Sequence, residues 1–196
     1  MWSRAYAVGL AAAIVAFAAA PAGGTGLRTS VTVFRAFTPT GAPEIKVHPV
    51  SGSCFTGSLT AARSDAWRCI VGNNLYDPCF SSPQAPGVVI CPNRDPTRGT
   101  EIRLTKGLPT TEANHGTPST KRLPWAVELY SGAYCALASG ALSVVDGLPG
   151  DYFCGAGAKN GLWGSPRRST EPWTIFSAPL TATSLSHRVS IRHAWT

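Results

Sequence analysis

Charged residues are scarce in this chain of 196 residues, at 14% of the total. A coiled coil needs many more charges, and a collagen-like chain needs far more than the 20 glycines found here. A disordered chain contains fewer apolar residues than the 44% of this sequence. Acidic residues are also few, ten against seventeen Lys and Arg, which gives a formal net charge of +7. The composition therefore favours one globular, mildly basic domain over a multidomain enzyme.

The motifs of common catalytic sites are missing as well. The sequence contains no G-x-S-x-G elbow, no H-E-x-x-H pair, no P-loop and no G-x-G-x-x-G fingerprint. Among the four histidines only His187 and His193 lie close in sequence, and an exposed strand face explains them better than a metal or proton-transfer site. We therefore expect no metal and no cofactor, and we favour a protein that is not an enzyme.

The first 22 residues are typical of a secretory signal peptide. Arg4 precedes an apolar run from Ala5 to Ala20, and small residues follow as far as Gly24, in the order of a positive region, an apolar region and a cleavage site. A retained transmembrane anchor is the alternative, but this Ala-rich run is shorter than the ~20 residues that cross a bilayer. We expect residues 1–22 to be removed and the rest to be secreted without a membrane span.

Six cysteines remain after the predicted cleavage, an even number that is typical of a disulfide framework in an exported protein. Of the 15 possible connectivities, pairing between sequence neighbours is favoured because each pair then brackets one compact unit of structure. This scheme leaves no thiolate for catalysis or for metal binding. The predicted bridges are Cys54–Cys69, Cys79–Cys91 and Cys135–Cys154.

Alternating apolar positions and turn dipeptides predict a mainly β fold, a small antiparallel sheet or barrel-like domain from residue 48 to 196. Residues 23–47 form either a flexible lead or a strand on the edge of that domain. The one expected helix spans 63–73, with Ser64 as its N-cap and Gly72 and Asn73 as its end. The expected strands include 53–59, 87–92, 100–106, 125–130, 134–137, 142–145, 151–154, 161–164, 173–176 and 189–195.

Several segments resemble a group of uncharacterised, exported, six-cysteine actinobacterial proteins. The resemblance runs from about Gly52 to the C-terminus and implies secretion and a single domain. It implies no activity and supplies no catalytic residue, because the group has none assigned. The segments that carry it are Ser-Cys-Phe-Thr-Gly-Ser at 53–58, Asp-Ala-Trp-Arg-Cys at 65–69, Gly-Asn-Asn-Leu-Tyr-Asp-Pro-Cys-Phe at 72–80, Leu-Pro-Trp-Ala-Val at 123–127, Leu-Trp-Gly at 162–164 and Trp-Thr-Ile-Phe at 173–176.

A loop rich in Gly and Pro between residues 161 and 173 is the best candidate for a binding surface. Two tryptophans and two adjacent arginines there are suited to stacking on a sugar or aromatic group and to pairing with an anion. Two arginines of the expected helix extend this surface. The competing interpretation places the tryptophans in the core and leaves the arginines solvated. The candidate residues are Trp163, Arg167, Arg168, Trp173, Arg63 and Arg68.

The function expected from these features is a secreted binding module at or outside the cell envelope. Its ligand is an anionic envelope polymer, a glycan or a protein, and nucleic acid is not expected because the positive charge is modest. One alternative is a small secreted hydrolase with a carboxylate pair drawn from Asp65, Asp77, Asp146 and Asp151. Another is an inhibitor-like module that presents residues 109–122.

Overall fold

The computed structural model describes residues 26–110, 123–140, 143–155 and 159–196, and these contain thirteen β-strands and no helix. The predicted signal peptide and most of the 109–122 segment lie outside the described residues. The strands are β1 (Ser30–Thr32), β2 (Lys46–Gly57), β3 (Ala66–Val71), β4 (Asn74–Ser81), β5 (Val88–Pro92), β6 (Arg98–Leu104), β7 (Ala126–Leu129), β8 (Tyr134–Leu137), β9 (Val144–Val145), β10 (Leu148–Cys154), β11 (Asn160–Arg167), β12 (Thr174–Pro179) and β13 (Arg188–Trp195).

Strands β2 to β6 form a closed barrel. Each strand is antiparallel to the next, and a parallel pairing of β2 with β6 closes the barrel. Residues 46–52 of the long strand β2 pair with β6, whereas residues 53–57 of the same strand pair largely with β3. Gly52 stands where the partner changes, and a Cβ there would lie 2.6 Å from the Ile70 carbonyl oxygen. Glycine therefore permits the close approach that the barrel needs.

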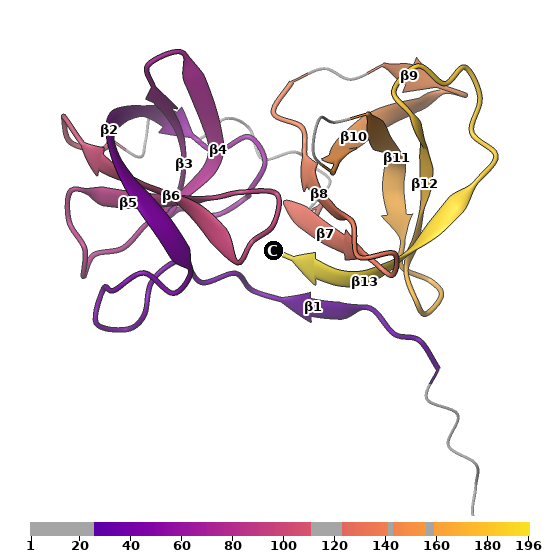
Figure 1. The fold of residues 1–196 in the computed structure, drawn as a ribbon, viewed down its shortest axis with the longest axis horizontal. Coiled ribbons are helices and arrows are strands. Elements are labelled where there is room, and N and C mark those ends of the chain that lie inside the picture. Colours follow the sequence, from indigo (N-terminus) through magenta and orange to yellow (C-terminus); the bar gives the residue numbers. More distant parts are fainter. Residues whose placement is uncertain (1–25, 111–122, 141–142, 156–158) are drawn as a thin grey trace, which may run out of the picture.

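The second half of the chain forms another closed sheet, which contains β7, β8, β10, β11, β12 and β13. Neighbouring strands are antiparallel, and the pairing of β13 with β7 completes the ring. β9 forms a hairpin with β10. β1 lies outside the ring and pairs in parallel with β13, so part of the 23–47 segment is an edge strand. Figure 1 shows the two closed sheets side by side, with β1 running along β13. The predicted mainly β, antiparallel and barrel-like fold is confirmed.

Each closed sheet has its own apolar core, and a third cluster joins them. Inside the first sheet, Trp67, Val89 and Ile102 pack around four cysteines; inside the second, the core includes Tyr152, whose hydroxyl donates a hydrogen bond to the Pro124 carbonyl. The stretch predicted as one domain is thus two closed sheets with a shared interface. We call that interface the junction cluster; its buried members are Phe34, Ala36, Ala61, Ala66, Phe80, Ile90, Trp125 and Ala126.

All three predicted disulfides are confirmed: Cys54–Cys69, Cys79–Cys91 and Cys135–Cys154. Each bridge joins neighbouring antiparallel strands. The partners Cys54 and Cys69 face each other directly in the β2–β3 register, as Cys135 and Cys154 do in the β8–β10 register. Bridges between adjacent strands close short segments, which is why pairing by sequence neighbourhood identified them.

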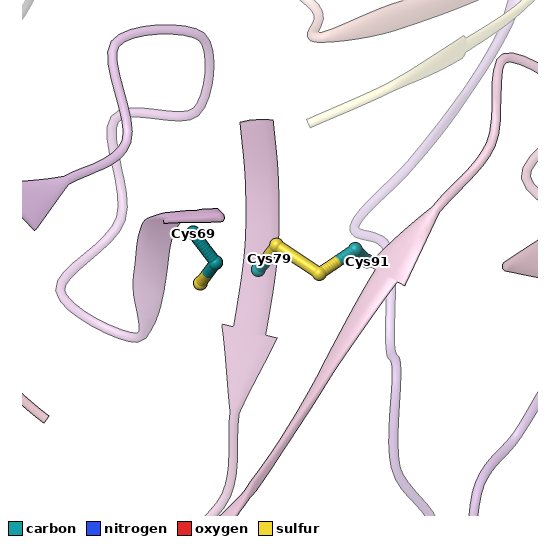
Figure 2. A group of neighbouring side chains, drawn as sticks. All are labelled: Cys69, Cys79 and Cys91. Atoms are coloured by element: carbon teal, nitrogen blue, oxygen red, sulfur yellow. A yellow bond between two sulfur atoms is a disulfide. The ribbon is translucent and has the colours of Figure 1, made fainter. Parts of the chain in front are cut away.

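Two of these disulfides lie together inside the first barrel. The sulfur atoms of Cys69, Cys79 and Cys91 are all within 4.8 Å of one another, a spacing that suits thiolate ligands of a metal ion. Figure 2 shows the Cys79–Cys91 bond beside the Cys69 side chain. Cys69 is bonded to Cys54, so every sulfur of this group is already part of a disulfide. The group therefore serves as core packing, with no free thiolate to bind a metal.

The helix expected over residues 63–73 is wrong. Residues 66–71 form strand β3, with Ala66 and Cys69 fully buried and Ile70 half-exposed. The capping signals at Ser64 and Gly72 fit the turns that flank a strand as well as they fit the ends of a helix. A two-turn helix is unstable alone, whereas the strand is bridged to β2 and hydrogen-bonded along both edges. Pairing with neighbouring strands thus outweighs the local helix signals. No helix of the described residues is long and apolar enough to cross a membrane.

Candidate functional site

A pocket of about 500 Å³ opens at the interface of the two closed sheets. Its walls come from the lead segment, from the loop before β3, from the residues before β7, from the loop after β11 and from the end of the chain. We call it the junction pocket because the buried Trp125 of the junction cluster is one of its walls. The residues that line it are Val33, Ala61, Ala62, Arg63, Leu123, Trp125, Arg168 and Thr196.

Arg63 is held in a fixed position at this pocket. Its Nε and Nη2 atoms donate to the two carboxylate oxygens of Asp65 at 2.9 and 2.6 Å, and its Nη1 donates to the Phe34 carbonyl at 2.6 Å. The guanidinium also lies over the Phe80 ring, 4.6 Å from the centroid. A guanidinium has five N–H groups, so two of them remain for another acceptor. Arg63 is therefore a preorganised donor whose charge Asp65 already balances.

Arg168 approaches the same pocket from the loop that follows β11. Its guanidinium lies 4.8 Å from the centroid of the Trp173 ring, a cation–π contact. The neighbouring Arg167 is exposed and donates a hydrogen bond to Ser169, and it is not among the residues that line the pocket. The fold thus brings Arg63 and Arg168, two predicted site residues that are far apart in sequence, to one cavity.

Trp125 adds an aromatic wall that sequence analysis missed. The residue is almost fully buried, and its indole Nε1 has no hydrogen-bond partner among the described residues. A buried polar group without a partner costs roughly 1–3 kcal/mol. Trp125 belongs to a predicted strand and to one of the segments that resemble the exported actinobacterial proteins. No local feature of the sequence marks it as part of a site. Its role depends on the second closed sheet meeting the first, which the sequence pattern does not describe.

Two other predicted site residues lie elsewhere. Trp163 is fully buried in β11, so its ring is not on a surface and its place in the predicted binding surface is wrong. Arg68 points to Asp77, with Nε 3.7 Å from Oδ2, and its Nη2 donates to the Ser139 carbonyl. Arg68 does not line the junction pocket. It lies in β3, a strand whose side chains alternate between two faces, and not in the helix that was expected to group it with Arg63.

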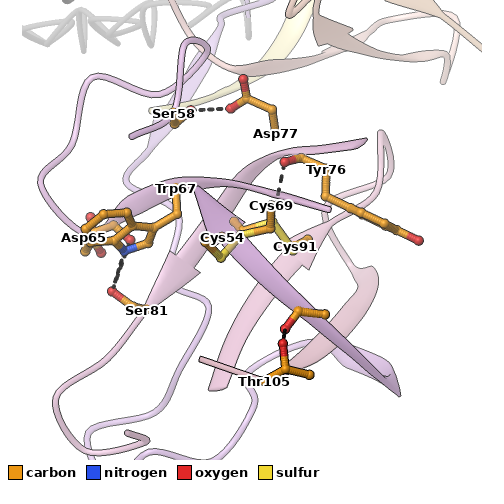
Figure 3. Close-up of a disulfide and its surroundings, with 12 residues drawn as sticks. Cys54, Ser58, Asp65, Trp67, Cys69, Tyr76, Asp77, Ser81, Cys91 and Thr105 are labelled. Atoms are coloured by element: carbon orange, nitrogen blue, oxygen red, sulfur yellow. Dashed lines mark hydrogen bonds between the residues drawn. A yellow bond between two sulfur atoms is a disulfide. The ribbon is translucent and has the colours of Figure 1, made fainter. Parts of the chain in front are cut away.

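Asp77 is the most deeply buried carboxylate of the first barrel, with a side chain only 1% exposed. It accepts hydrogen bonds from the Ser58 and Thr60 hydroxyls and from the Leu59 backbone N–H, and Figure 3 shows the Ser58 contact. Burial raises the pKa of Asp77 above its usual value, although these hydrogen bonds and the Arg68 charge act in the opposite direction. The arrangement anchors the 58–60 turn to β4.

The other candidates for acid–base chemistry have separate surroundings. Asp65 is the partner of Arg63, and Asp146 accepts a hydrogen bond from the Leu185 backbone N–H in a turn. Asp151 lies half-buried in β10. No Asp or Glu side chain lines the junction pocket, so the pair of side-chain carboxylates that the hydrolase alternative requires is not found there.

The two histidines discussed above also differ in their surroundings. His187 is exposed, whereas His193 stacks on the Trp195 ring with centroids 4.2 Å apart.

No protein-family model, no curated protein and no solved structure matches this chain. The site must therefore be interpreted from its own chemistry.

Proposed function

We propose that this protein is a secreted binding module that holds an amphipathic anion in the junction pocket, a ligand with one carboxylate or phosphate group and an apolar body. Secretion follows from the signal peptide expected at residues 1–22, and three disulfides suit an oxidising compartment outside the cytoplasm. A secreted protein meets its ligand at or outside the cell envelope, so we expect the ligand there.

The observation that carries this proposal is the donor-rich polar lining of the pocket. Arg63 and Arg168 contribute N–H groups with no accepting atom in their side chains. Trp125 contributes its buried aromatic ring to the same wall. A carboxylate or a phosphate group is the natural complement, because each offers several acceptors and a negative charge.

Apolar side chains define the rest of the ligand. Val33, Ala61, Ala62 and Leu123 line the pocket beside the Trp125 ring. An apolar wall with a few convergent polar groups is the usual composition of a small-molecule site. The lining side chains include no histidine, thiol or carboxylate that would act as a base or a strong nucleophile. This composition supports binding over catalysis.

Calorimetric titration of the oxidised exported protein with decanoate tests the proposal, with decan-1-ol as a neutral ligand of the same chain length. We expect decanoate to bind more tightly than decan-1-ol, because only the carboxylate pairs with the guanidinium groups. Arg168→Gln should weaken decanoate binding about tenfold, a loss of about 1.4 kcal/mol. It should leave decan-1-ol binding nearly unchanged.

Arg167→Gln provides the matched control. It removes the same positive charge at the neighbouring position, from a side chain that does not line the pocket. Its decanoate affinity should equal that of the wild type. Equal losses in the two variants would show that net charge, and not the pocket, determines the affinity. Absence of decanoate binding by the wild type would refute the proposed ligand class.

A further inference from the structure

A second surface, on the side of β13 that carries His193 and Trp195, has a different chemistry from the junction pocket. Tyr134 of β8 faces Glu128 of β7, and Glu128 is in turn the neighbour of His193 on β13. Trp195 lies two residues beyond His193 and projects from the same face of the strand. Figure 1 shows β7 and β13 on the side of the second sheet that faces the first barrel.

Three rings form a continuous aromatic surface on this face. The His193 and Trp195 rings are nearly parallel, with centroids 4.2 Å apart, and the Tyr134 ring lies 6.1 Å from Trp195 at an angle of 41°. His193 is held by its Nε2, 2.9 Å from the Thr32 hydroxyl of β1. Each of the three side chains is only partly buried, so part of this surface faces solvent.

Tyr134 lines one hollow and Trp195 lines another, and the connection between β5 and β6 of the first barrel contributes residues to both. One, of about 640 Å³, is lined by Tyr134 and residues 93–95; the other, of about 670 Å³, is lined by Trp195 together with Pro96 and Thr97. We call the pair the aromatic groove. Arg94 donates a hydrogen bond to the Gly155 carbonyl, which ties this wall to the second sheet. Asp95 accepts hydrogen bonds from the backbone N–H and the hydroxyl of Thr97, so the wall is fixed from within.

Charges along the aromatic groove are nearly balanced. Arg192 and Glu128 form an ion pair at 3.3 Å, and Arg94 is followed by Asp95. Glu44, Lys46 and Arg35 all line the hollow beside Trp195, which leaves that hollow with a small excess of positive charge. Burial lowers the pKa of His193, which favours its neutral form. This balance contrasts with the junction pocket, whose charged lining side chains are both arginines. An ionic ligand therefore gains little in the aromatic groove.

We propose that the aromatic groove binds a neutral oligosaccharide, with sugar rings stacked on Tyr134 and Trp195. A sugar ring presents a face of C–H groups that packs on an aromatic ring, and its hydroxyls both donate and accept hydrogen bonds. The groove offers the matching groups side by side: aromatic faces, carboxylate acceptors and guanidinium donors. Two hollows in series suit a chain of several sugars better than a single one.

Affinity electrophoresis through gels that contain a neutral soluble polysaccharide tests this proposal, with hydroxyethylcellulose, galactomannan and glycogen as the three probes. We expect at least one of them to retard the wild-type protein. Tyr134→Ala should weaken that retardation at least about fivefold, because a stacking platform is removed. Tyr134→Phe keeps the ring and should retain most of the binding.

Phe55→Ala is the control, because it removes a half-exposed aromatic ring of the first barrel that does not line the groove. It should migrate like the wild type, and thermal unfolding of each variant reports whether the fold is intact. Arg168→Gln should also bind these polysaccharides normally, so failure of the junction pocket and failure of the groove are distinguishable. No retardation by any probe, or an equal loss in Tyr134→Ala and Phe55→Ala, would overturn the proposal.

Discussion

Phe34→Ala tests whether the lead segment holds the two closed sheets together. The Phe34 side chain is only 4% exposed, and its ring lies 5.1 Å from the Phe80 ring of the first barrel and 5.1 Å from the Trp125 ring next to the second. Burial of a phenylalanine contributes about 1.5–3 kcal/mol, and each aromatic pair adds about 1 kcal/mol. The expected loss of about 4 kcal/mol agrees with the range of about 3–5 kcal/mol for such substitutions.

This substitution removes the ring and leaves the backbone contacts of Phe34 in place. Its N–H still donates to the Thr196 carbonyl, and its carbonyl still accepts from Arg63. The measurement is urea unfolding of the oxidised protein, followed by tryptophan fluorescence. The control is Val33→Ala, because that side chain is 62% exposed and should change the free energy of unfolding by less than about 0.5 kcal/mol. If Phe34→Ala costs less than about 1 kcal/mol, the segment does not join the sheets.

Two further predictions concern stability. Replacing Cys135 and Cys154 together by alanine should cost about 3 kcal/mol in urea unfolding, because the unfolded chain regains the freedom of a closed loop of roughly 20 residues; an unchanged midpoint would show that this bridge contributes nothing. Burial raises the pKa of Asp77 above 3.8, so the folded protein binds this proton more tightly than the unfolded chain does, and the Asp77 contribution to stability should fall as pH rises above about 4. Between pH 4 and pH 7 the free energy of unfolding should fall less in Asp77→Asn than in the wild type. An equal fall in the two proteins would contradict the role assigned to Asp77.

Most strands could be predicted because their signals are local. Alternation of apolar and polar residues marks 126–129 and 188–195, where the inward side chains Val127 and Ile191 are fully buried. The disulfides were also predictable, because each joins cysteines that are neighbours among the six along the chain. The error at β3 has the opposite cause. The capping pattern around residues 63–73 is local, but the pairing of β3 with β2 and β4 is not, and pairing determines the outcome.

The candidate sites were only partly predictable. Residue type identified Arg63 and Arg168, since guanidinium groups near aromatic rings suit anion binding. The two tryptophans of the predicted surface differ in burial: Trp163 lies fully buried inside the second sheet, whereas Trp173 is only partly buried. Spacing along the chain indicates which side chains share a face of a strand, but not which other elements that face meets.

By itself, the sequence determined most of the β-strands, their turns and the three bridges, because these depend on residues close together in the chain. The tertiary structure decided how the strands close into two barrels, through the parallel β2–β6 pairing and the β13–β7 pairing. It also decided where the barrels meet, and hence that Arg63, Trp125 and Arg168 share one pocket. Such contacts depend on the fit of two folded surfaces, and that fit exists only after the local elements have formed and packed.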